Sequence, residues 1–273
     1  MDTKFAFIGA GALAGAVAEC LASYAGGAEK AGFYLYDKSA TKYEKFAGKS
    51  YVPQPSIESV VKNGTFIVLS VKPQNLPEVL NEIKKVPSHT EKTYILPCAG
   101  VPIKSVTDAL GDVGVVRVMP NMPLKIGHGV TAMCRNELVT DTRYLYIYGV
   151  FASCGDVFEL PEGEMNAVIG ATASSPAYVY LFIKAMVEGC KRLGMDPELM
   201  LDPVCHAVIG SAYMLLKSGM KPDELISMVA TKGGTTESAI SVLEAGGFVE
   251  LIADAMTACA RRADELADTA AGK

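Results

Sequence analysis

A glycine-rich segment near the N-terminus has the spacing of a dinucleotide-binding loop. Gly9, Gly11 and Ala14 follow an apolar stretch at 4–8, which matches the pattern G-x-G-x-x-G/A placed directly after a strand. In that pattern the first glycine makes a tight turn and the second lets the backbone approach a pyrophosphate. The small third residue lets a helix pack closely on the strand. The chemistry expected here is the binding of a dinucleotide cofactor.

A second segment with chemical potential lies at 231–236 and reads Thr-Lys-Gly-Gly-Thr-Thr. A glycine pair beside hydroxyl groups, at the start of an expected helix, presents free backbone N–H groups to a carboxylate or a phosphate. The alternative interpretation is an ordinary helix cap with a glycine turn. Binding of a small anion is the function that this segment predicts.

The elements around the first loop have the alternation of a doubly wound sheet. Apolar strand-like runs are expected at 4–8, 33–37, 66–71, 93–96 and 115–119, with helices from about 12 and at 56–62, 75–86 and 102–110. Strands that are apolar along their whole length indicate a parallel sheet covered on both faces. The apolar N-terminus could also be a signal peptide, but the alternation after it favours a strand. We therefore predict a Rossmann-type dinucleotide-binding domain over 1–162.

Beyond residue 162 helix signals replace strand signals. A cap residue followed by proline marks expected helix starts at 175–176, 196–197 and 202–203, and Gly219 marks an end. Further helices are expected from 222 and after 236, with a break at 246–247. No stretch of 18 apolar residues lacks a charge, which argues against a membrane span. We predict an all-α domain over 163–273.

The composition excludes several classes of function. Of 273 residues 50% are hydrophobic and 20% are charged, and the net charge is −5. Lysines and arginines are scattered, which argues against nucleic acid and an anionic membrane as partners. Seven dispersed cysteines indicate free thiols in a reducing compartment, and three distant histidines give no metal spacing. The low charge of the helical half fits a monomeric cap less well than a dimer interface.

The residues after the second expected strand bear on which cofactor binds. An acidic residue there accepts the ribose hydroxyls of NAD, whereas cationic and hydroxyl groups suit the NADP phosphate. Asp37 favours NAD, while Lys38, Ser39 and Lys42 favour NADP. An ordinary polar loop is the third interpretation.

Together these segments resemble the pyrroline-5-carboxylate reductase family over nearly the whole chain. The most specific match is Lys232-Gly-Gly-Thr-Thr236, followed by the sequence Val-Leu-Glu-Ala-Gly-Gly-Phe at 242–248. Supporting matches stand in the family's order at 7–11, 71–73, 99–100, 116–123 and 174–179. The chain departs from the family at Thr231-Lys232, where Ser-Pro is usual. It also departs at Met122 in place of threonine and at Ala173 in place of glycine.

The resemblance implies a fold and an activity. The family joins a dinucleotide-binding domain to an interwoven helical dimerisation domain, and its dimers often build larger rings, a decamer among them. Its members reduce the ring imine of 1-pyrroline-5-carboxylate to L-proline, the last step of proline biosynthesis, usually with NADPH and sometimes with NADH. We therefore expect a cytoplasmic homodimer that uses NADPH, with NADH as the alternative, and holds no metal.

The resemblance also implies site residues. The catalytic residue is Thr236, which would hydrogen-bond the ring nitrogen. The substrate-binding residues are Thr231, Gly233, Gly234, Thr235, Thr236 and Glu162. The cofactor-binding residues are Ile8, Gly9, Gly11, Ala12, Leu13, Asp37, Lys38, Ser39, Ser56, Val71, Lys72, Pro73, Ala99 and Asn121.

The chemistry of imine reduction fits a site without histidine or a catalytic carboxylate. A protonated iminium already accepts hydride well, so that proximity and a fixed substrate carboxylate supply most of the acceleration. A β-hydroxyacid dehydrogenase would instead need a lysine between a glycine and an asparagine on the first long helix, and Lys184 has neither neighbour. A non-catalytic NADP-binding regulator is the remaining alternative, and the intact Gly-Gly-Thr-Thr loop counts against it.

Overall fold

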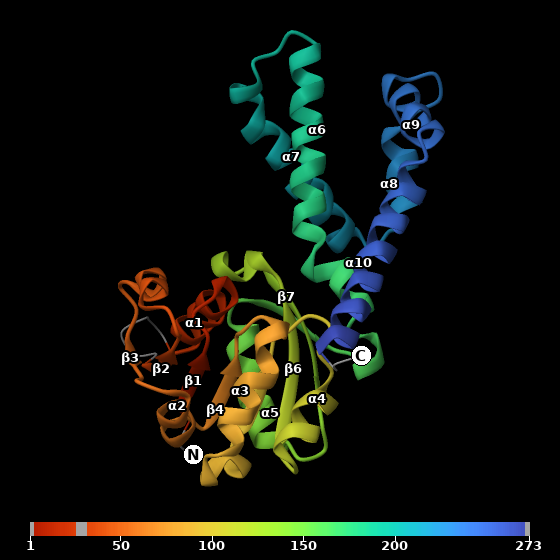
Figure 1. Ribbon diagram of the computed structural model, residues 1–273. Helices are drawn as coiled ribbons and strands as arrows, with labels where there is room; N and C mark the ends of the chain where they lie inside the picture. The colour runs from red at the N-terminus through yellow and green to blue at the C-terminus, as the bar shows by residue number, and fades with distance from the viewer. Residues whose placement is uncertain (1–2, 26–31, 271–273) are drawn as a thin grey trace. The chain divides into compact units, whose positions relative to one another are not determined.

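The chain folds into two compact units, which are described separately. The computed structural model describes residues 3–25 and 32–270 (Figure 1). One unit consists of Met1–Ser174 with Thr257–Lys273, and the other is Ser175–Met256. The first unit therefore extends beyond the division at 162/163 expected from the sequence and includes the end of the last helix.

An eight-stranded sheet forms the centre of the first unit, in the order β3-β2-β1-β4-β5-β6-β7-β8. The strands are β1 (Phe5–Ile8), β2 (Phe33–Tyr36), β3 (Tyr51–Pro53), β4 (Phe66–Leu69), β5 (Thr93–Leu96), β6 (Gly114–Pro120), β7 (Gly129–Arg135) and β8 (Gly155–Glu159). The first six are parallel, β7 is antiparallel to β6, and β8 is parallel to β7. This confirms the Rossmann-type prediction, while β3, β7 and β8 were not predicted.

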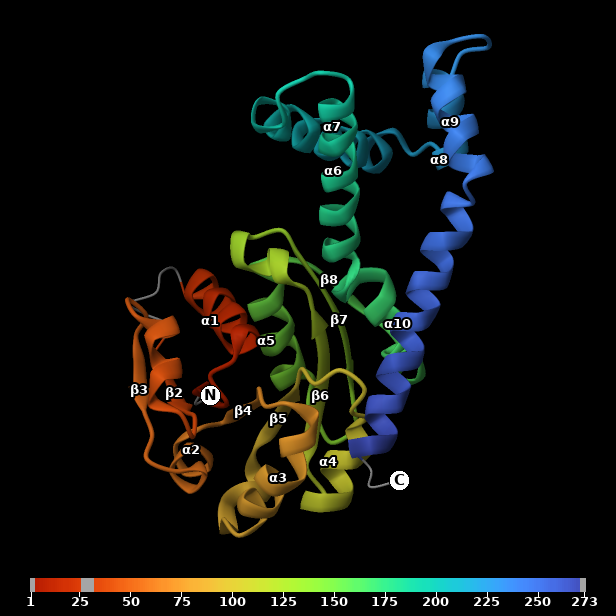
Figure 2. The ribbon, with the colours of Figure 1, turned by 45° about the horizontal axis from the view of Figure 1, so that its top comes forward.

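Helices cover both faces of the sheet. One face carries α1 (Ala12–Tyr24) and α5 (Asp141–Ala152), which lie side by side (Figure 2). The other carries α2 (Ile57–Asn63), α3 (Leu76–Lys84) and α4 (Ile103–Leu110). Because strand side chains alternate between faces, Phe7 packs in the core with α1 and Ile8 in the core with α2. The two faces of the sheet therefore belong to two separate clusters of buried apolar residues.

The second unit is helical, as predicted. It contains α6 (Ser175–Arg192), α7 (Pro197–Ser218), α8 (Pro222–Val229), α9 (Thr235–Ala245) and the first part of α10 (Phe248–Ala270). The Asp196 side chain caps α7 by accepting from the Glu198 N–H at 2.9 Å, and Gly219 ends it with φ +68°. The expected helix start at 202–203 was wrong, because Pro203 lies inside α7. A proline there removes a single backbone donor, and the helix continues through it.

Large apolar side chains are exposed on the second unit by itself. On α7 alone, Leu199, Ile209, Tyr213, Met214 and Leu216 are each at least half exposed. Among the described helices, α7 is the one long and apolar enough to cross a membrane. Of its most apolar 18-residue stretch, 6% is buried within the chain. The expectation that none of these helices could span was therefore too strict. Several large apolar side chains exposed on one helix indicate an interaction site.

Candidate active site

A cavity of about 420 Å³ opens at the carboxyl ends of β1, β2 and β4. This is the edge at which a doubly wound sheet binds its ligand. The cavity contains seven of the predicted cofactor-binding residues, which are Ile8, Gly9, Gly11, Asp37, Lys38, Val71 and Lys72. It also contains Lys42, which was expected to favour NADP, and five residues that were not predicted, which are Tyr36, Ile57, Ser70, Asn75 and Val79. Dinucleotide binding therefore has a built site within one unit.

Gly9 makes the tight turn expected of the first glycine. Its φ is +102°, and its N–H donates to the Tyr36 carbonyl oxygen at 2.8 Å. A Cβ at this position would lie 2.7 Å from the Ser70 carbonyl carbon and closer still to its oxygen. Glycine is therefore required here by the packing of the chain itself.

Gly11 has a different reason to be glycine. It is the N-cap of α1 with φ −74°, and the nearest atom to a Cβ built there is the Ser70 carbonyl oxygen at 3.8 Å. The chain would therefore tolerate a side chain, which would project into the cavity. No side chain caps α1, and its first turn has no acidic residue, so the helix N-terminus is available to an anion. This cradle fits a dinucleotide pyrophosphate.

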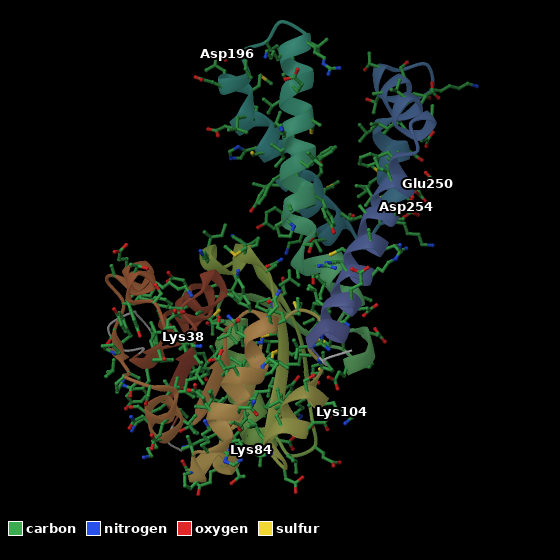
Figure 3. All side chains as sticks on the ribbon, in the orientation of Figure 1. Lys38, Lys84, Lys104, Asp196, Glu250 and Asp254 are labelled. Atoms are coloured by element: carbon green, nitrogen blue, oxygen red, sulfur yellow. The ribbon has the colours of Figure 1, made fainter. Side chains whose placement is uncertain are left out.

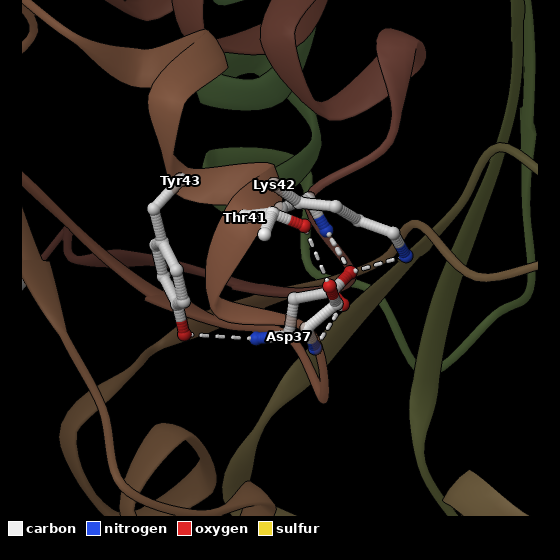
Figure 4. Close-up of polar contacts among 6 residues, drawn as sticks. Asp37, Thr41, Lys42 and Tyr43 are labelled. Atoms are coloured by element: carbon white, nitrogen blue, oxygen red, sulfur yellow. Dashed lines mark hydrogen bonds and ion pairs between the residues drawn. The ribbon is translucent and has the colours of Figure 1, made fainter.

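Asp37 is the centre of a polar cluster beside the glycine loop (Figure 4). Its Oδ2 accepts from the Ala10 N–H at 2.8 Å and from Lys42 Nζ at 3.0 Å, and its Oδ1 accepts from the Ser39 N–H at 2.9 Å. The Asp37 N–H donates to the Tyr43 hydroxyl. Burial by itself would raise the pKa of Asp37, but these donors outweigh it and hold the pKa below its ordinary value.

Lys38 forms an ion pair at the rim of the cavity. Its Nζ lies 2.7 Å from Glu78 Oε1, and both side chains are 60% exposed. The hydrogen bond to Glu78 raises the pKa of Lys38. Figure 3 shows this lysine on the first unit, well apart from Lys104 on α4. An exposed pair of this kind contributes little to stability, so Lys38 can exchange Glu78 for an anionic ligand.

Of the other predicted cofactor residues, Leu13, Ser39, Ser56, Pro73, Ala99 and Asn121 are not among those that line the cavity. Ala12 and Leu13 are in the first turn of α1, Pro73 begins a 3-10 helix, and Ala99 follows β5. The Ser56 hydroxyl caps α2, and the Ser39 hydroxyl bonds Thr41. Asn121 is buried, accepts from the Val130 N–H and donates to the Thr172 carbonyl. The side chains of Ser56 and Asn121 are thus engaged in supporting the fold.

The loop at 231–236 lies in the second unit. Gly233 has φ +77° and its N–H donates to Glu237 Oε2 at 2.6 Å, while the Gly234 N–H donates to the Thr231 carbonyl oxygen. Gly234 is the N-cap residue of α9, and it has no side chain with which to cap the helix. The loop therefore already holds one carboxylate, that of Glu237, on a backbone amide. This shows that the loop can hold an anion.

Thr236 lies in the first turn of α9, next to an apolar cavity of about 630 Å³. The cavity is formed by α7, α8 and α9, with lining residues Ala207, Gly210, Ser211, Met214, Leu225, Ile226, Met228, Val229, Thr236 and Ile240. Thr236 and Ser211 are the hydroxyl residues among them. A hydroxyl at the edge of an apolar cavity is suited to hold one polar atom of a small ring.

Glu162 has a structural role in the first unit. Its Oε1 accepts from the Ile103 N–H at 2.5 Å, at the start of α4, and lies 3.9 Å from a guanidinium nitrogen of Arg117. Arg117 is 2% exposed, and burial lowers its pKa. Arg117 also donates to Asn166, which in turn donates to Asp264 on α10. This network was not predicted from the sequence, although a lone arginine within an apolar strand is its signal.

Glu162 is expected to matter for stability. We expect Glu162→Ala to lower the free energy of unfolding by about 1.5 to 3 kcal/mol, because the Ile103 amide loses a charged acceptor and Arg117 loses its nearest carboxylate. Glu162→Gln retains an acceptor and should cost less. Urea denaturation measures both, with the neighbouring exposed Glu164→Ala as control. Equal stability of the Glu162→Ala and Glu164→Ala variants would refute the capping role.

The comparisons with known proteins agree with this arrangement. Residues 162–266 match the family model described as pyrroline-5-carboxylate reductase dimerisation, and residues 4–100 match the model described as NADP oxidoreductase coenzyme F420-dependent. Pyrroline-5-carboxylate reductase of Escherichia coli K12 is 32% identical over 97% of this chain and 99% of its own. The enzyme of Methanosarcina acetivorans is 34% identical over 76% and 77%.

A solved structure gives the same result for the fold. The crystal structure of pyrroline carboxylate reductase from Plasmodium falciparum with NADP bound superposes with a TM-score of 0.87 and 28% identity, covering 97% of this chain and 98% of that one. The chain belongs to the pyrroline-5-carboxylate reductase family.

Proposed function

We propose that the chain reduces 1-pyrroline-5-carboxylate to L-proline with NADPH. The observation that carries this is the built dinucleotide crevice at Gly9 and Gly11, in a chain that is 32% identical to a pyrroline-5-carboxylate reductase over nearly its whole length. NADPH when bound supplies the hydride. The cofactor is held by the glycine loop and the N-terminus of α1 at its pyrophosphate, and by Lys38 at its 2′-phosphate. Val71 and Lys72 lie toward the nicotinamide.

The second unit supplies the substrate contacts. The substrate carboxylate binds the backbone amides of Gly233, Gly234 and Thr235, of which the Gly233 N–H already donates to the Glu237 carboxylate. Thr236 hydrogen-bonds the ring nitrogen and steadies its proton. Because the iminium is protonated before hydride arrives, no strong acid is required. Glu162 contributes as a support of the fold.

The apolar faces of α6 to α9 form the interface between copies of the chain. The match to a dimerisation model over 162–266 supports a homo-oligomer, and burial of α7 in that interface accounts for its apolar surface without a membrane. We propose a cytoplasmic homodimer, assembled further into a ring of five dimers by analogy with the family. Light scattering after size exclusion gives the mass, and a stable monomer at micromolar concentration would contradict the interface.

The test of function is the loss of reduced-cofactor absorbance on adding 1-pyrroline-5-carboxylate. We expect turnover with NADPH and slower turnover with NADH, and L-proline as the product by chromatography. Binding of NADPH without turnover would favour a regulator. Oxidation of a β-hydroxyacid in place of imine reduction would favour a dehydrogenase.

A further inference from the structure

The carboxylate of Asp37 is turned inward and fully engaged. Its side chain is 6% exposed and accepts from the amides of Ala10 and Ser39 as well as from Lys42. In an NAD site a carboxylate at the end of the second strand accepts the ribose hydroxyls. Here both oxygens already accept from the protein, Oδ2 from the Ala10 N–H inside the glycine loop and from Lys42, and Oδ1 from the Ser39 N–H. Asp37 therefore positions the loop.

The charge of Asp37 nevertheless remains at the edge of the cofactor cavity. The hydrogen-bond donors around it hold the pKa of Asp37 below its ordinary value, which favours the charged form. Lys42 is the cation in direct contact with it, and its side chain is 47% exposed and lines the cavity. Lys38, the other cation at this end, is paired with Glu78.

We propose that Lys42 is a specificity-determining residue for NADPH, because it neutralises Asp37 where the cofactor's 2′-phosphate approaches. This rests on the proposed function, since it assumes that NADPH occupies this cavity. Without Lys42 an ionised carboxylate would face a phosphate of about two negative charges, and like charges at such distances repel strongly near a protein surface. NADH carries a hydroxyl in that position and is not repelled.

The test compares the two cofactors in one variant. We expect Lys42→Gln to lower kcat/KM for NADPH by about 10- to 100-fold and for NADH by no more than about 3-fold. The affinity for adenosine 2′,5′-bisphosphate should fall in parallel, while that for adenosine 5′-monophosphate should not. Lys104→Gln removes the same charge from an exposed pair with Asp108 on α4 and is the control.

A double variant tests the route through Asp37. In an Asp37→Asn background, Lys42→Gln should lower kcat/KM for NADPH by a much smaller factor than in the wild type, because no carboxylate is left for Lys42 to neutralise. A full loss in that background would overturn neutralisation and assign a direct phosphate contact instead. Lys42→Arg should retain the preference for NADPH.

Failure of this inference is distinct from failure of the proposed function. If the wild-type chain does not turn over 1-pyrroline-5-carboxylate with NADPH, the proposed function fails, whatever Lys42 does. If the wild-type chain turns over this substrate and Lys42→Gln changes kcat/KM by the same factor for both cofactors, only the role of Lys42 is overturned. Thermal unfolding of each variant without cofactor separates loss of the loop's structure from loss of charge.

Discussion

Replacing Gly9 by alanine is expected to abolish cofactor binding and to destabilise the first unit. The new methyl group would overlap the carbonyl of Ser70, which follows β4, while the backbone is held at φ +102°. The cost combines backbone strain with the separation of two neighbouring strands and amounts to about 2 to 6 kcal/mol of unfolding free energy. Denaturation monitored by circular dichroism measures it, and titration with NADPH measures the loss of binding.

Two further glycine variants separate the causes. Gly111→Ala has a similar φ of +82° but nothing within 4 Å of the new Cβ, so it carries the strain without the clash. We expect it to cost about 1 to 2 kcal/mol and to leave NADPH binding intact. Gly11→Ala has φ −74° and should fold normally but bind NADPH at least about tenfold more weakly, because its methyl group occupies the pyrophosphate cradle. Wild-type affinity in Gly11→Ala would contradict the position of the cofactor.

The strands of the central sheet could be predicted where burial on both faces makes them continuously apolar. β1, β4 and β5 are buried at every position. β8 has the sequence Gly-Asp-Val-Phe-Glu and is partly exposed along its length, because it is an edge strand, so it lacks a continuous apolar run. The helix α5 contains the run Tyr-Leu-Tyr-Ile-Tyr at 144–148, which has the composition of a strand. It forms a helix because packing against α1 outweighs that local preference.

The functional residues could be predicted where backbone geometry alone explains them. The spacing at Gly9 correctly indicated a tight turn, because its φ of +102° favours glycine, whereas the pyrophosphate cradle at Gly11 stays a prediction. The role of Asp37 could not be predicted, because the same residue type serves NAD recognition or loop positioning. Its hydrogen bonds to Ala10 and Ser39, which the sequence does not reveal, support the positioning of the loop. Glu162 likewise depends on its contacts with Ile103 and Arg117, both distant in sequence.

Replacing Thr236 by alanine is expected to reduce kcat by about 10- to 1,000-fold while the fold is retained. Thr236 lies at the second position of α9, after the Gly234 N-cap, so its removal leaves the backbone amides of the loop in place. The substrate carboxylate should therefore still bind, and KM should change less than kcat. What is lost is the hydroxyl that holds the ring nitrogen and its proton while hydride is transferred.

Neighbouring variants make this result specific to the hydroxyl group. Thr236→Ser retains the hydroxyl and should keep kcat within about tenfold of the wild type, whereas Thr236→Val keeps the shape and should behave like alanine. Thr235→Ala removes the adjacent hydroxyl on the same turn and serves as a control for α9 itself. If Thr236→Val were as active as Thr236→Ser, the hydroxyl would have no part in catalysis. The loop would then act through its amides alone, and the acceleration would come from the fixed carboxylate and the bound cofactor.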